Sequence, residues 1–348
     1  MMHMGEFDLI RRYFARPSLP AAPGVRERTV VGIGDDCAIL QPTPGMQLAI
    51  SSDMLVEGRH FLSTVNPAHL GHKALAVNLS DLAACGARPL GFTLALSLPS
   101  VDEAWLAGFS HGLFALADAH ACPLVGGDTT RGPLNICITV FGEVPPGQAL
   151  LRSGAKVGDE LWVSGTLGDA RLALEVFRGN VSVPAEVFDA ARARMEQPAP
   201  RVALGQALRG IASAAIDVSD GLLGDLGHVL RASHAGQGTT GGVGVRINTA
   251  KAATLFASNL IAANGHPACA GGHFSPKMQL DCVLAGGDDY ELAFTAPAAL
   301  HSAVLAAGLS TSTLVTCIGQ IEAEPGVRLV DSEGQLLHNS YSSFDHFA

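Results

Sequence analysis

Aspartate recurs in five short segments of this chain, each time beside Gly, Ser or Thr and mostly after an apolar run. Such an ending is typical of a strand or helix that gives way to a loop. Several carboxylates that gather in one place repel one another unless cations lie between them, and hard oxygen ligands select magnesium-like ions. The pattern therefore predicts a magnesium-dependent phosphate site. The segments are residues 34–36, 51–53, 78–81, 126–129 and 217–221.

The length of the chain predicts more than one domain. Its 348 residues exceed the usual size of a single hydrophobic core, so two α/β domains are expected. The 40 glycines and the low aromatic content of 5% suit sheets and helices that are joined by tight turns. The step Pro145-Pro146-Gly147 is the best candidate linker, which predicts domains at 1–145 and 146–348.

The charge balance narrows the class of ligand. With 22 basic against 32 acidic residues the net charge is -10, which argues against a nucleic-acid surface, because phosphate backbones are bound chiefly by Lys and Arg. An anionic substrate would therefore need metal ions to bridge it to this protein. The seven cysteines form no C-x-x-C pair, and their odd number favours a reducing compartment. We find no signal-type start and no apolar stretch of membrane-spanning length, so we expect a cytoplasmic protein without a membrane partner.

Hydrophobic periodicity predicts alternating strands and helices. On the expected helix at 70–85, Asn78 and Asp81 lie about one turn apart and can face one ligand. Ser219 or Asp220 is expected to cap a helix at 221–232, whose unpaired N–H groups can hold a phosphate. We read 235–244 as a loop and 253–263 as helical. Strands are expected at 28–34, 46–52, 91–98, 134–144, 160–164, 212–218 and 278–284, and further helices at 102–119, 167–177 and 201–210.

Missing motifs restrict the mechanism. The chain has no G-x-x-x-x-G-K-[ST] loop and no kinase-type H-R-D or D-F-G, which excludes the two commonest phosphate-transfer folds. No thiol or imidazole stands out as a nucleophile. A single Gly-Asp or Ser-Asp turn is usually only a cap, but five together favour a chemistry that depends on metals and positioning.

Nine strings, in order along nearly the whole chain, resemble the thiamine-monophosphate kinase family. They are G-E-F-D-L-I at 5–10, G-I-G-D-D-C-A at 32–38, L-A-I-S-S-D-M-L-V-E-G-R-H-F at 48–61, K-A-L-A-V-N-L-S-D-L-A-A-C-G-A at 73–87, G-G-D-T-T-R-G-P at 126–133, R-S-G-A at 152–155, I-D-V-S-D-G-L at 216–222, G-G-D-D-Y-E-L at 286–292 and C-I-G-Q at 317–320. Because so many long strings coincide, the signal is far more specific than any single Gly-Asp turn.

The resemblance implies an enzyme that transfers the γ-phosphoryl group of ATP to thiamine phosphate with several Mg²⁺ ions. It implies the α/β (α+β) fold of aminoimidazole ribonucleotide synthetase, with a dimer formed through the N-terminal sheet. The N-terminal domain would bind metal and nucleotide and dimerise, and the C-terminal domain would complete the ATP and thiamine phosphate site. Matching positions imply metal ligands at Asp36, Ser51, Ser52, Asp53, Asp81, Asp128, Asp217 and Asp220, ATP contacts at Gly127, Asp128, Arg152 and Ser219, and thiamine phosphate contacts at His60, Asp288 and Tyr341.

Two positions depart from the family pattern. The family often has Glu at the position of Asp288 and Trp at the position of Tyr341, and Phe344 is a rival to Tyr341 for stacking on the substrate. The Gly-rich segment 233–275 also looks longer than the family needs, as an insertion would.

No side-chain base is expected in the reaction. The attacking oxygen belongs to a phosphate monoester, whose second pKa of about 6 leaves it largely ionised at neutral pH. Arg152 can add a forked set of donors to the triphosphate.

Three alternatives stay open. The first is another ATP-using enzyme of the same superfamily, although a selenophosphate synthetase would want a reactive Cys and a lysine before Gly32. The second is a hydrogenase maturation factor, which would want a C-terminal cysteine where this chain has Ala348. The third is a non-catalytic sensor of nucleotide or thiamine phosphate.

Overall fold

The computed structural model describes residues 5–16, 28–236, 242–256, 274–338 and 341. The chain separates into two compact units: unit 1 comprises Met1–Leu82 and Ala87–Gly147, and unit 2 comprises Ala83–Gly86 and Gln148–Ala348. Within the described ranges, none of the helices combines the length and the apolar character that a membrane span requires. The functional roles expected of the two domains stay predictions.

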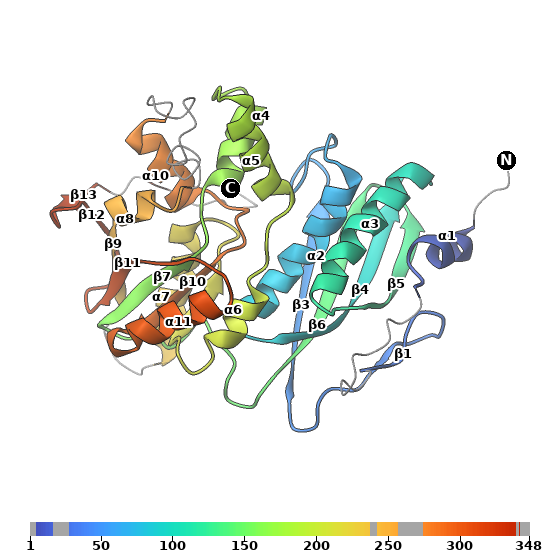
Figure 1. Cartoon of the computed structure of the whole chain (residues 1–348), viewed down its shortest axis with the longest axis horizontal. Helices are drawn as coiled ribbons and strands as arrows, with labels where there is room; N and C mark the ends of the chain where they lie inside the picture. The colour runs from blue at the N-terminus through green and yellow to red at the C-terminus, as the bar shows by residue number, and fades with distance from the viewer. Residues whose placement is uncertain (1–4, 17–27, 237–241, 257–273, 339–340, 342–348) are drawn as a thin grey trace. The chain divides into compact units, whose positions relative to one another are not determined.

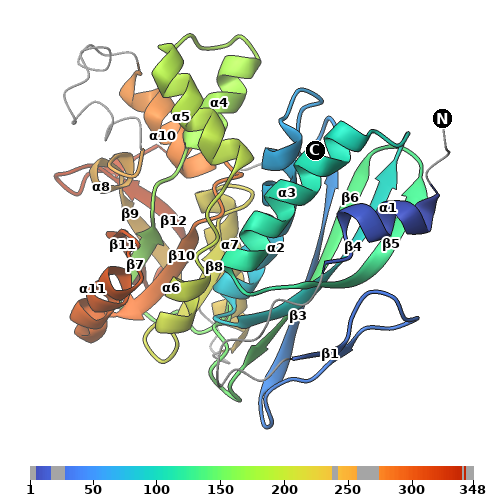
Figure 2. The same cartoon turned by 45° about the vertical axis from the view of Figure 1, so that its right-hand side comes forward.

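Unit 1 is built on a four-stranded sheet that two helices cover on one face (Figures 1 and 2). The strand order is β3-β6-β4-β5, and only the β4–β5 pair is parallel. The strands are β3 (Gln47–Val56), β4 (Arg88–Leu98), β5 (Leu124–Arg131) and β6 (Asn135–Val144), and the covering helices are α2 (Pro67–Ala84) and α3 (Glu103–Ala119).

Helices α2 and α3 cross at unusually short range because glycines lie at the crossing. A Cβ atom on Gly112 would lie 1.8 Å from the carbonyl oxygen of Ala68, and one on Gly71 would lie 2.0 Å from that of Phe109. At the start of α3, the side chain of Asp102 accepts hydrogen bonds from the N–H groups of Ala104 and Trp105, which satisfies two otherwise unpaired donors. The helices expected at 70–85 and 102–119 are confirmed.

Shorter elements border this sheet. They are α1 (Glu6–Tyr13), β1 (Thr29–Val31) and β2 (Ile39–Leu40). Glu143 of β6 is completely buried and is paired with Arg28 at 3.0 Å and with Arg88, and its carboxylate also accepts a hydrogen bond from the N–H of Thr43 at 2.8 Å. The carboxylate thereby anchors the segment around β1 and β2 to the sheet.

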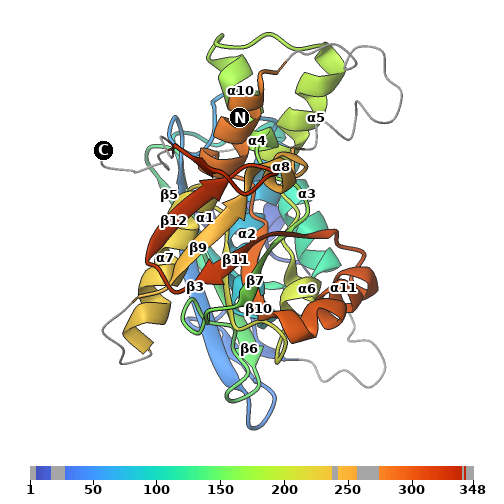
Figure 3. The same cartoon turned by 90° about the vertical axis from the view of Figure 1, so that its left-hand side faces the viewer.

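Unit 2 is built on a seven-stranded sheet of order β13-β12-β9-β11-β7-β10-β8. Figure 3 shows its strands β12, β9, β11 and β7 next to one another. All pairs are antiparallel except β9 with β12. The strands are β7 (Asp159–Ser164), β8 (Ala214–Asp217), β9 (Gly244–Asn248), β10 (Leu292–Pro297), β11 (Val315–Glu322), β12 (Gly326–Val330) and β13 (Leu336–Leu337).

Most helices of unit 2, α6 and α11 excepted, contribute apolar side chains to one core together with β7, β8 and β9. Leu161, Ile216 and Ile247 supply the strand side of that core, and Leu222 and Leu226 supply part of the helix side. The helices are α4 (Asp169–Phe177), α5 (Ala185–Glu196), α6 (Val202–Ala207), α7 (Leu222–Gly236), α8 (Thr249–Ala253), α10 (Pro276–Ala285) and α11 (His301–Ser310), with a short 3-10 turn η1 (Ala298–Leu300).

The strand expected at 278–284 is wrong, because this segment lies within helix α10. Ser275 accepts a hydrogen bond from the N–H of Met278 at 3.2 Å, and Pro276 occupies the first turn. A short apolar run does not distinguish a strand from a buried helix, and the Ser-Pro start signal decides the matter.

The loop expected at 235–244 is only partly right. Helix α7 extends through Gly236 and β9 begins at Gly244, while residues 237–241 lie outside the described residues. A helix was expected at 253–263. Helix α8 ends at Ala253, and residues 257–263 lie outside the described part. All of residues 257–273 lie outside the described part, so the insertion expected within 233–275 stays a prediction.

Candidate functional site

Strand β3 and helix α2 bring three of the expected metal ligands together. The side chains of Ser51 and Asp53 lie on the face of β3 that is directed toward α2. The Ser51 hydroxyl donates a hydrogen bond to Oδ2 of Asp81, and the backbone N–H of Asp53 donates to Oδ1 of Asn78 at 3.1 Å. Asn78 and Asp81 thus face the same strand, as their spacing predicts.

Electrostatics make this cluster unusual. Burial, and after it the negative charge of Asp81, raise the pKa of Asp53 to about 6. Two carboxylates and a hydroxyl are the oxygen donors that Mg²⁺ prefers, and a cation between them would relieve the repulsion. The donor set therefore fits magnesium, although the described residues contain no group of three or more His, Cys, Asp or Glu side chains arranged to hold a metal ion.

Ser52 lies on the opposite face of β3, because successive side chains of a strand alternate. Its Oγ is 3.0 Å from Oγ1 of Thr139 and donates to the carbonyl oxygen of Ile138 at 3.2 Å. The structure therefore does not bring the hydroxyl of Ser52 to the side chains of Asp53 and Asp81.

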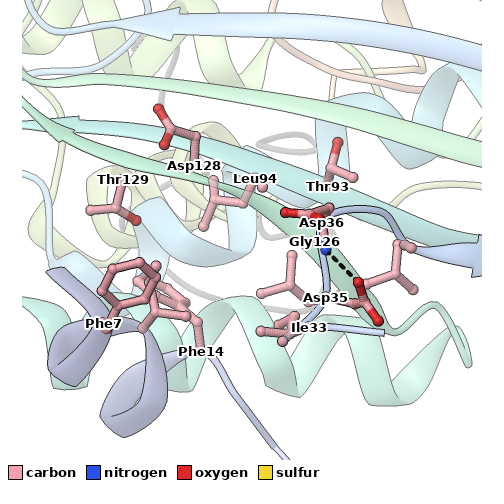
Figure 4. A pocket seen from close by; sticks show the side chains of 16 residues that line it. Phe7, Phe14, Ile33, Asp35, Asp36, Thr93, Leu94, Gly126, Asp128 and Thr129 are labelled. Carbon is pink, nitrogen blue, oxygen red and sulfur yellow. Dashed lines mark hydrogen bonds between the residues drawn. The ribbon is translucent and has the colours of Figure 1, made fainter. Parts of the chain in front are cut away.

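A cavity of about 630 Å³ in unit 1 joins two other expected ligands, Asp36 and Asp128, across 92 residues of sequence (Figure 4). The N–H of Asp36 donates to Oδ1 of Asp35 at 2.8 Å. Phe7 and Phe14 line the same cavity (Figure 4). The cavity thus combines carboxylates with an aromatic wall, a lining that suits a nucleotide-sized anion bound through cations.

Gly127 lies on this cavity and must be glycine. Its φ is +145°, and a Cβ atom there would lie 1.9 Å from the carbonyl oxygen of Leu94 on the adjacent strand β4. The segment 126–129 was expected in a turn, but it lies within β5, just as 51–53 lies within β3 and 78–81 within α2. The expectation of a turn at 126–129 is wrong, and Asp53 lies inside β3 instead of at its end, whereas Asp81 lies on a helix as expected.

His60 follows β3 and is fixed by the backbone. Its Nδ1 accepts a hydrogen bond from the N–H of Val56 at 3.0 Å, and its carbonyl oxygen accepts one from Nζ of Lys73 at 3.3 Å. When Nδ1 accepts, the neutral ring carries its proton on Nε2. His60 can therefore donate a hydrogen bond from Nε2 to a phosphate.

In unit 2, Asp217 ends strand β8 and the loop 218–221 leads into α7. The N–H groups of Ser219, Asp220 and Gly221 donate to Oδ2 of Asp225 at 3.1, 3.2 and 3.2 Å. The N–H of Gly221, one of the donors that were expected to hold a phosphate directly, is therefore taken by a carboxylate of the protein. Asp225 was not predicted as a site residue, although an acidic residue in the first turn of an expected helix is a recognisable signal.

The pKa of Asp225 is itself raised. Burial raises its pKa to about 6, the charge of Asp220 adds to this, and the three N–H donors oppose it. Asp220 and Arg152 both act on His228 as well: burial, then Arg231 and Arg152, lower the pKa of His228, and Asp220 raises it. Arg152, an expected ATP contact, and Asp220, an expected metal ligand, therefore both lie close enough to His228 to shift its pKa.

Asp288 lies beside Ser219. The N–H of Asp288 donates to the carbonyl oxygen of Ser219 at 2.8 Å, and the N–H of Tyr290 donates to that of Val218 at 2.9 Å. Unit 2 thus joins an expected thiamine phosphate contact to an expected ATP contact.

Tyr341 lines another cavity, which lies in unit 2 and has a volume of about 320 Å³. Glu175, Met278 and Asp281 line it as well. Nζ of Lys277 is 5.9 Å from the centroid of its ring. Phe344, the rival stacking residue, lies outside the described residues.

The expected site residues are divided between the two units. Unit 1 holds Asp36, Ser51, Ser52, Asp53, His60, Asp81, Gly127 and Asp128, and unit 2 holds Arg152, Asp217, Ser219, Asp220, Asp288 and Tyr341. Their assignments as metal, ATP and substrate contacts stay predictions.

The fold and the sequence define a class of protein. Residues 34–144 match the family described as AIR synthase related protein, N-terminal domain. The fold is also similar to that of E. coli HypE, a hydrogenase maturation protein, with a TM-score of 0.69 and 21% identity over 97% of this chain and 96% of that chain. The expected aminoimidazole ribonucleotide synthetase-like fold is confirmed; at this identity the HypE likeness concerns the fold alone.

Two proteins with a higher sequence identity to this chain than HypE are thiamine-monophosphate kinases. The chain is 44% identical to a thiamine-monophosphate kinase of Escherichia coli K12 over 348 residues, covering 100% of this chain and 99% of that protein. A solved thiamine-monophosphate kinase from Stenotrophomonas maltophilia K279a is 42% identical with a TM-score of 0.77, covering 90% and 93%. The structure of AaThiL complexed with AMPPCP and TMP is 26% identical with a TM-score of 0.69, covering 88% and 89%. The chain belongs to the thiamine-monophosphate kinase family, as the resemblance predicts.

Proposed function

We propose that this protein transfers the γ-phosphoryl group of ATP to thiamine phosphate, giving thiamine diphosphate and ADP. The observation that carries the proposal is the full-length 44% identity to a thiamine-monophosphate kinase. The similar fold of AaThiL, solved with AMPPCP and TMP, supports both substrates.

Magnesium is the proposed metal, with the expected carboxylates and the hydroxyl of Ser51 as its ligands. Bound Mg²⁺ supplies the positive charge that lets two anionic phosphates approach each other. The crowding of Asp53 and Asp81 supports this role, because burial and like charge both oppose ionisation of Asp53 in the protein alone.

The chain's own residues bind and orient the two substrates in this proposal. Gly127 allows the backbone of β5 to approach the phosphate chain closely, and Arg152 donates to the triphosphate. His60 donates from Nε2 to thiamine phosphate, Asp288 contacts it, and Tyr341 presents an aromatic face to its cationic ring. No residue acts as a base, because the attacking phosphate oxygen is already largely ionised at neutral pH.

We also propose a homodimer through the sheet of unit 1. The face of β3 opposite α2 exposes Leu48, Ile50 and Met54, which are 53%, 61% and 54% exposed. Three large apolar side chains in a row on one strand support burial against a second copy. Sedimentation of the wild-type protein is expected to report a dimer and that of Ile50→Asp a monomer; a monomeric wild-type protein at micromolar concentration contradicts the dimer. A cytoplasmic location stays a prediction.

The deciding experiment is a direct assay. The purified protein is incubated with ATP, magnesium and thiamine phosphate, and thiamine diphosphate is measured, with free thiamine as the control substrate. We expect thiamine diphosphate from thiamine phosphate only. Phosphorylation of thiamine but not of thiamine phosphate would overturn the proposed substrate.

A further inference from the structure

An ionic cluster that is centred on the fully buried Glu291 lies at the end of the loop at 286–291. Glu291 has no exposed side-chain surface, and four hydrogen bonds reach its carboxylate. Arg201 donates from Nε to Oε2 at 2.6 Å and from Nη2 to Oε1 at 2.5 Å. Arg194 donates from Nη2 to Oε1 at 2.8 Å, and the Ser164 hydroxyl donates to Oε2 at 2.6 Å.

Two further hydrogen bonds connect this part of the chain to the segment 164–168. Directly after the loop, the Ser164 hydroxyl accepts a hydrogen bond from the N–H of Leu292 at 2.8 Å. Within the loop, Oδ2 of Asp289 accepts one from the N–H of Gly168 at 2.8 Å. Arg194 also donates to the carbonyl oxygen of Thr166 at 3.3 Å, so its guanidinium bridges the loop and the segment that supports it.

The loop held in this way has a strained backbone. Asp288 and Tyr290 have φ angles of +72° and +53°, a left-handed region that residues with a Cβ atom seldom adopt. Such conformations persist where the surroundings determine them, and they gather at functional sites. Hydrogen bonds to the carbonyl oxygens of Ser219 and Val218 hold these two residues from the other side.

The cluster is not built for stability alone. A buried ion pair is often no more stabilising than apolar residues of the same volume. Among the described residues, Nε of Arg194 and Oδ1 of Asp289 are buried and have no hydrogen-bond partner, which is costly for a purely structural core. What this arrangement does supply is a fixed direction for the backbone between Gly286 and Glu291.

We propose that Glu291, Arg194 and Arg201 are positioning residues that hold Asp288 in its left-handed conformation beside Ser219. The inference rests on the proposed function, in which Asp288 contacts thiamine phosphate and Ser219 contacts ATP. The three charged side chains then set the position of the Asp288 carboxylate relative to Ser219 without touching either substrate.

The test compares two arginines on helix α5. Arg194→Lys keeps the positive charge but replaces the planar fork by a single ammonium group. Arg192→Lys is the matched control, because Arg192 lies two residues away and pairs with Glu196 at 2.8 Å instead of with Glu291. We expect Arg194→Lys to raise the KM for thiamine phosphate at least tenfold, with the KM for ATP changed less than twofold, and Arg192→Lys to change neither.

Hydrogen–deuterium exchange gives a readout that does not depend on activity. In the unliganded protein, amides of residues 286–291 are expected to exchange at least tenfold faster in Arg194→Lys than in Arg192→Lys, because the N–H groups of Asp288 and Tyr290 lose their fixed acceptors. A folded Arg194→Lys variant with unchanged KM and unchanged exchange overturns the proposal. If that variant does not fold, Ser164→Ala removes one hydrogen bond from Glu291 and one from Leu292, and we expect changes of at least threefold in both readouts; no change overturns the proposal as well.

The two proposals fail in different ways. A wild-type protein that makes no thiamine diphosphate overturns the proposed function, and an exchange contrast at 286–291 that is still present shows that the loop is nevertheless positioned by the cluster. An active wild-type protein whose variants match it in both KM and exchange overturns the positioning role alone.

Discussion

Asp53 in unit 1 and Glu291 in unit 2 are both acidic side chains removed from water, but their surroundings differ. Asp53 lies beside Asp81, and burial and that neighbouring charge raise its pKa to about 6. Glu291 is more deeply buried, but two arginines and a serine donate to its carboxylate. The protein therefore neutralises one carboxylate with its own side chains and leaves the other in repulsion.

This difference separates structural from ligand-binding carboxylates. A buried carboxylate with internal cations completes the fold by itself, and its loss leaves buried positive charge. A carboxylate held against another carboxylate costs stability until an external cation arrives, which is the behaviour expected of a metal site. Four predictions test this contrast, in decreasing order of expected effect.

The largest effect is expected for Glu291→Gln. Breaking a buried ion pair by removing one partner typically costs about 3–5 kcal/mol, because an uncompensated charge stays buried. The free energy of unfolding, measured in urea, should fall by that amount. The control is Glu322→Gln, since Glu322 is partly exposed, pairs with Arg246 and Arg328, and should cost about 1 kcal/mol or less. An equal loss of unfolding free energy in Glu291→Gln and Glu322→Gln would contradict the structural role of Glu291.

The next effect is expected for Asp53→Asn, which should lower turnover and leave the fold intact. A loss of at least about a hundredfold, or about 2.7 kcal/mol of transition-state stabilisation, is expected at saturating magnesium and ATP. Without metal, the melting temperature should stay equal or rise, since repulsion with Asp81 is relieved. Asp128→Asn should behave likewise in turnover, and the exposed Asp189→Asn on α5 is the control. Near-normal turnover in Asp53→Asn or Asp128→Asn contradicts the metal assignment.

A smaller effect is expected from magnesium itself. A ligand that binds only the folded protein stabilises it by RT ln(1 + [L]/Kd), about 1.4 kcal/mol at ten times Kd. Mg²⁺ added with ATP should raise the melting temperature of the wild-type protein, and EDTA should reverse the change. Asp53→Asn should lose most of this response, whereas Glu322→Gln should keep it. An undiminished response in Asp53→Asn would place the metal elsewhere.

The smallest effect is a pH dependence at Glu143, the neutralised carboxylate of unit 1. Burial raises its pKa, but the N–H of Thr43, Arg88 and Arg28 lower it more, so the net pKa lies below the ordinary value of 4.5. A lowered pKa means that the folded state binds fewer protons, so this stabilisation is complete above about pH 4.5 and is lost as the pH falls through the folded-state pKa. The free energy of unfolding of Glu143→Gln should therefore change less between about pH 5 and pH 3 than that of the wild-type protein. Parallel pH profiles of the two proteins contradict this role.

Much of the fold was predictable from local pattern. The strand at 46–52 and the helices at 70–85 and 102–119 agree with β3, α2 and α3 because their periodicity is long enough to be unambiguous. The strand expected at 278–284 is wrong because a short segment with five apolar and two polar residues suits either element. Helix α5 and strand β5 were not predicted, and Asp128 of β5 was expected in a turn.

The candidate site was predictable as a set of residues but not as an arrangement. The matched strings name Asp53, Asp81 and Asp128, yet the opposite direction of Ser52 follows only from the pleat of β3. The partners of Glu291 lie 97 and 90 residues away at Arg194 and Arg201, and no local pattern pairs them. Asp225 was predictable from local sequence, because it follows Gly221 by one helical turn.

The amino-acid sequence alone determined the family, the kind of donor atoms and the need for external cations, because these depend on which side chains are present. Tertiary structure decided which carboxylates are relieved by arginines and which repel one another. That distinction depends on distances between residues far apart in the chain, since a charge interaction is set by position in space and by the water excluded around it.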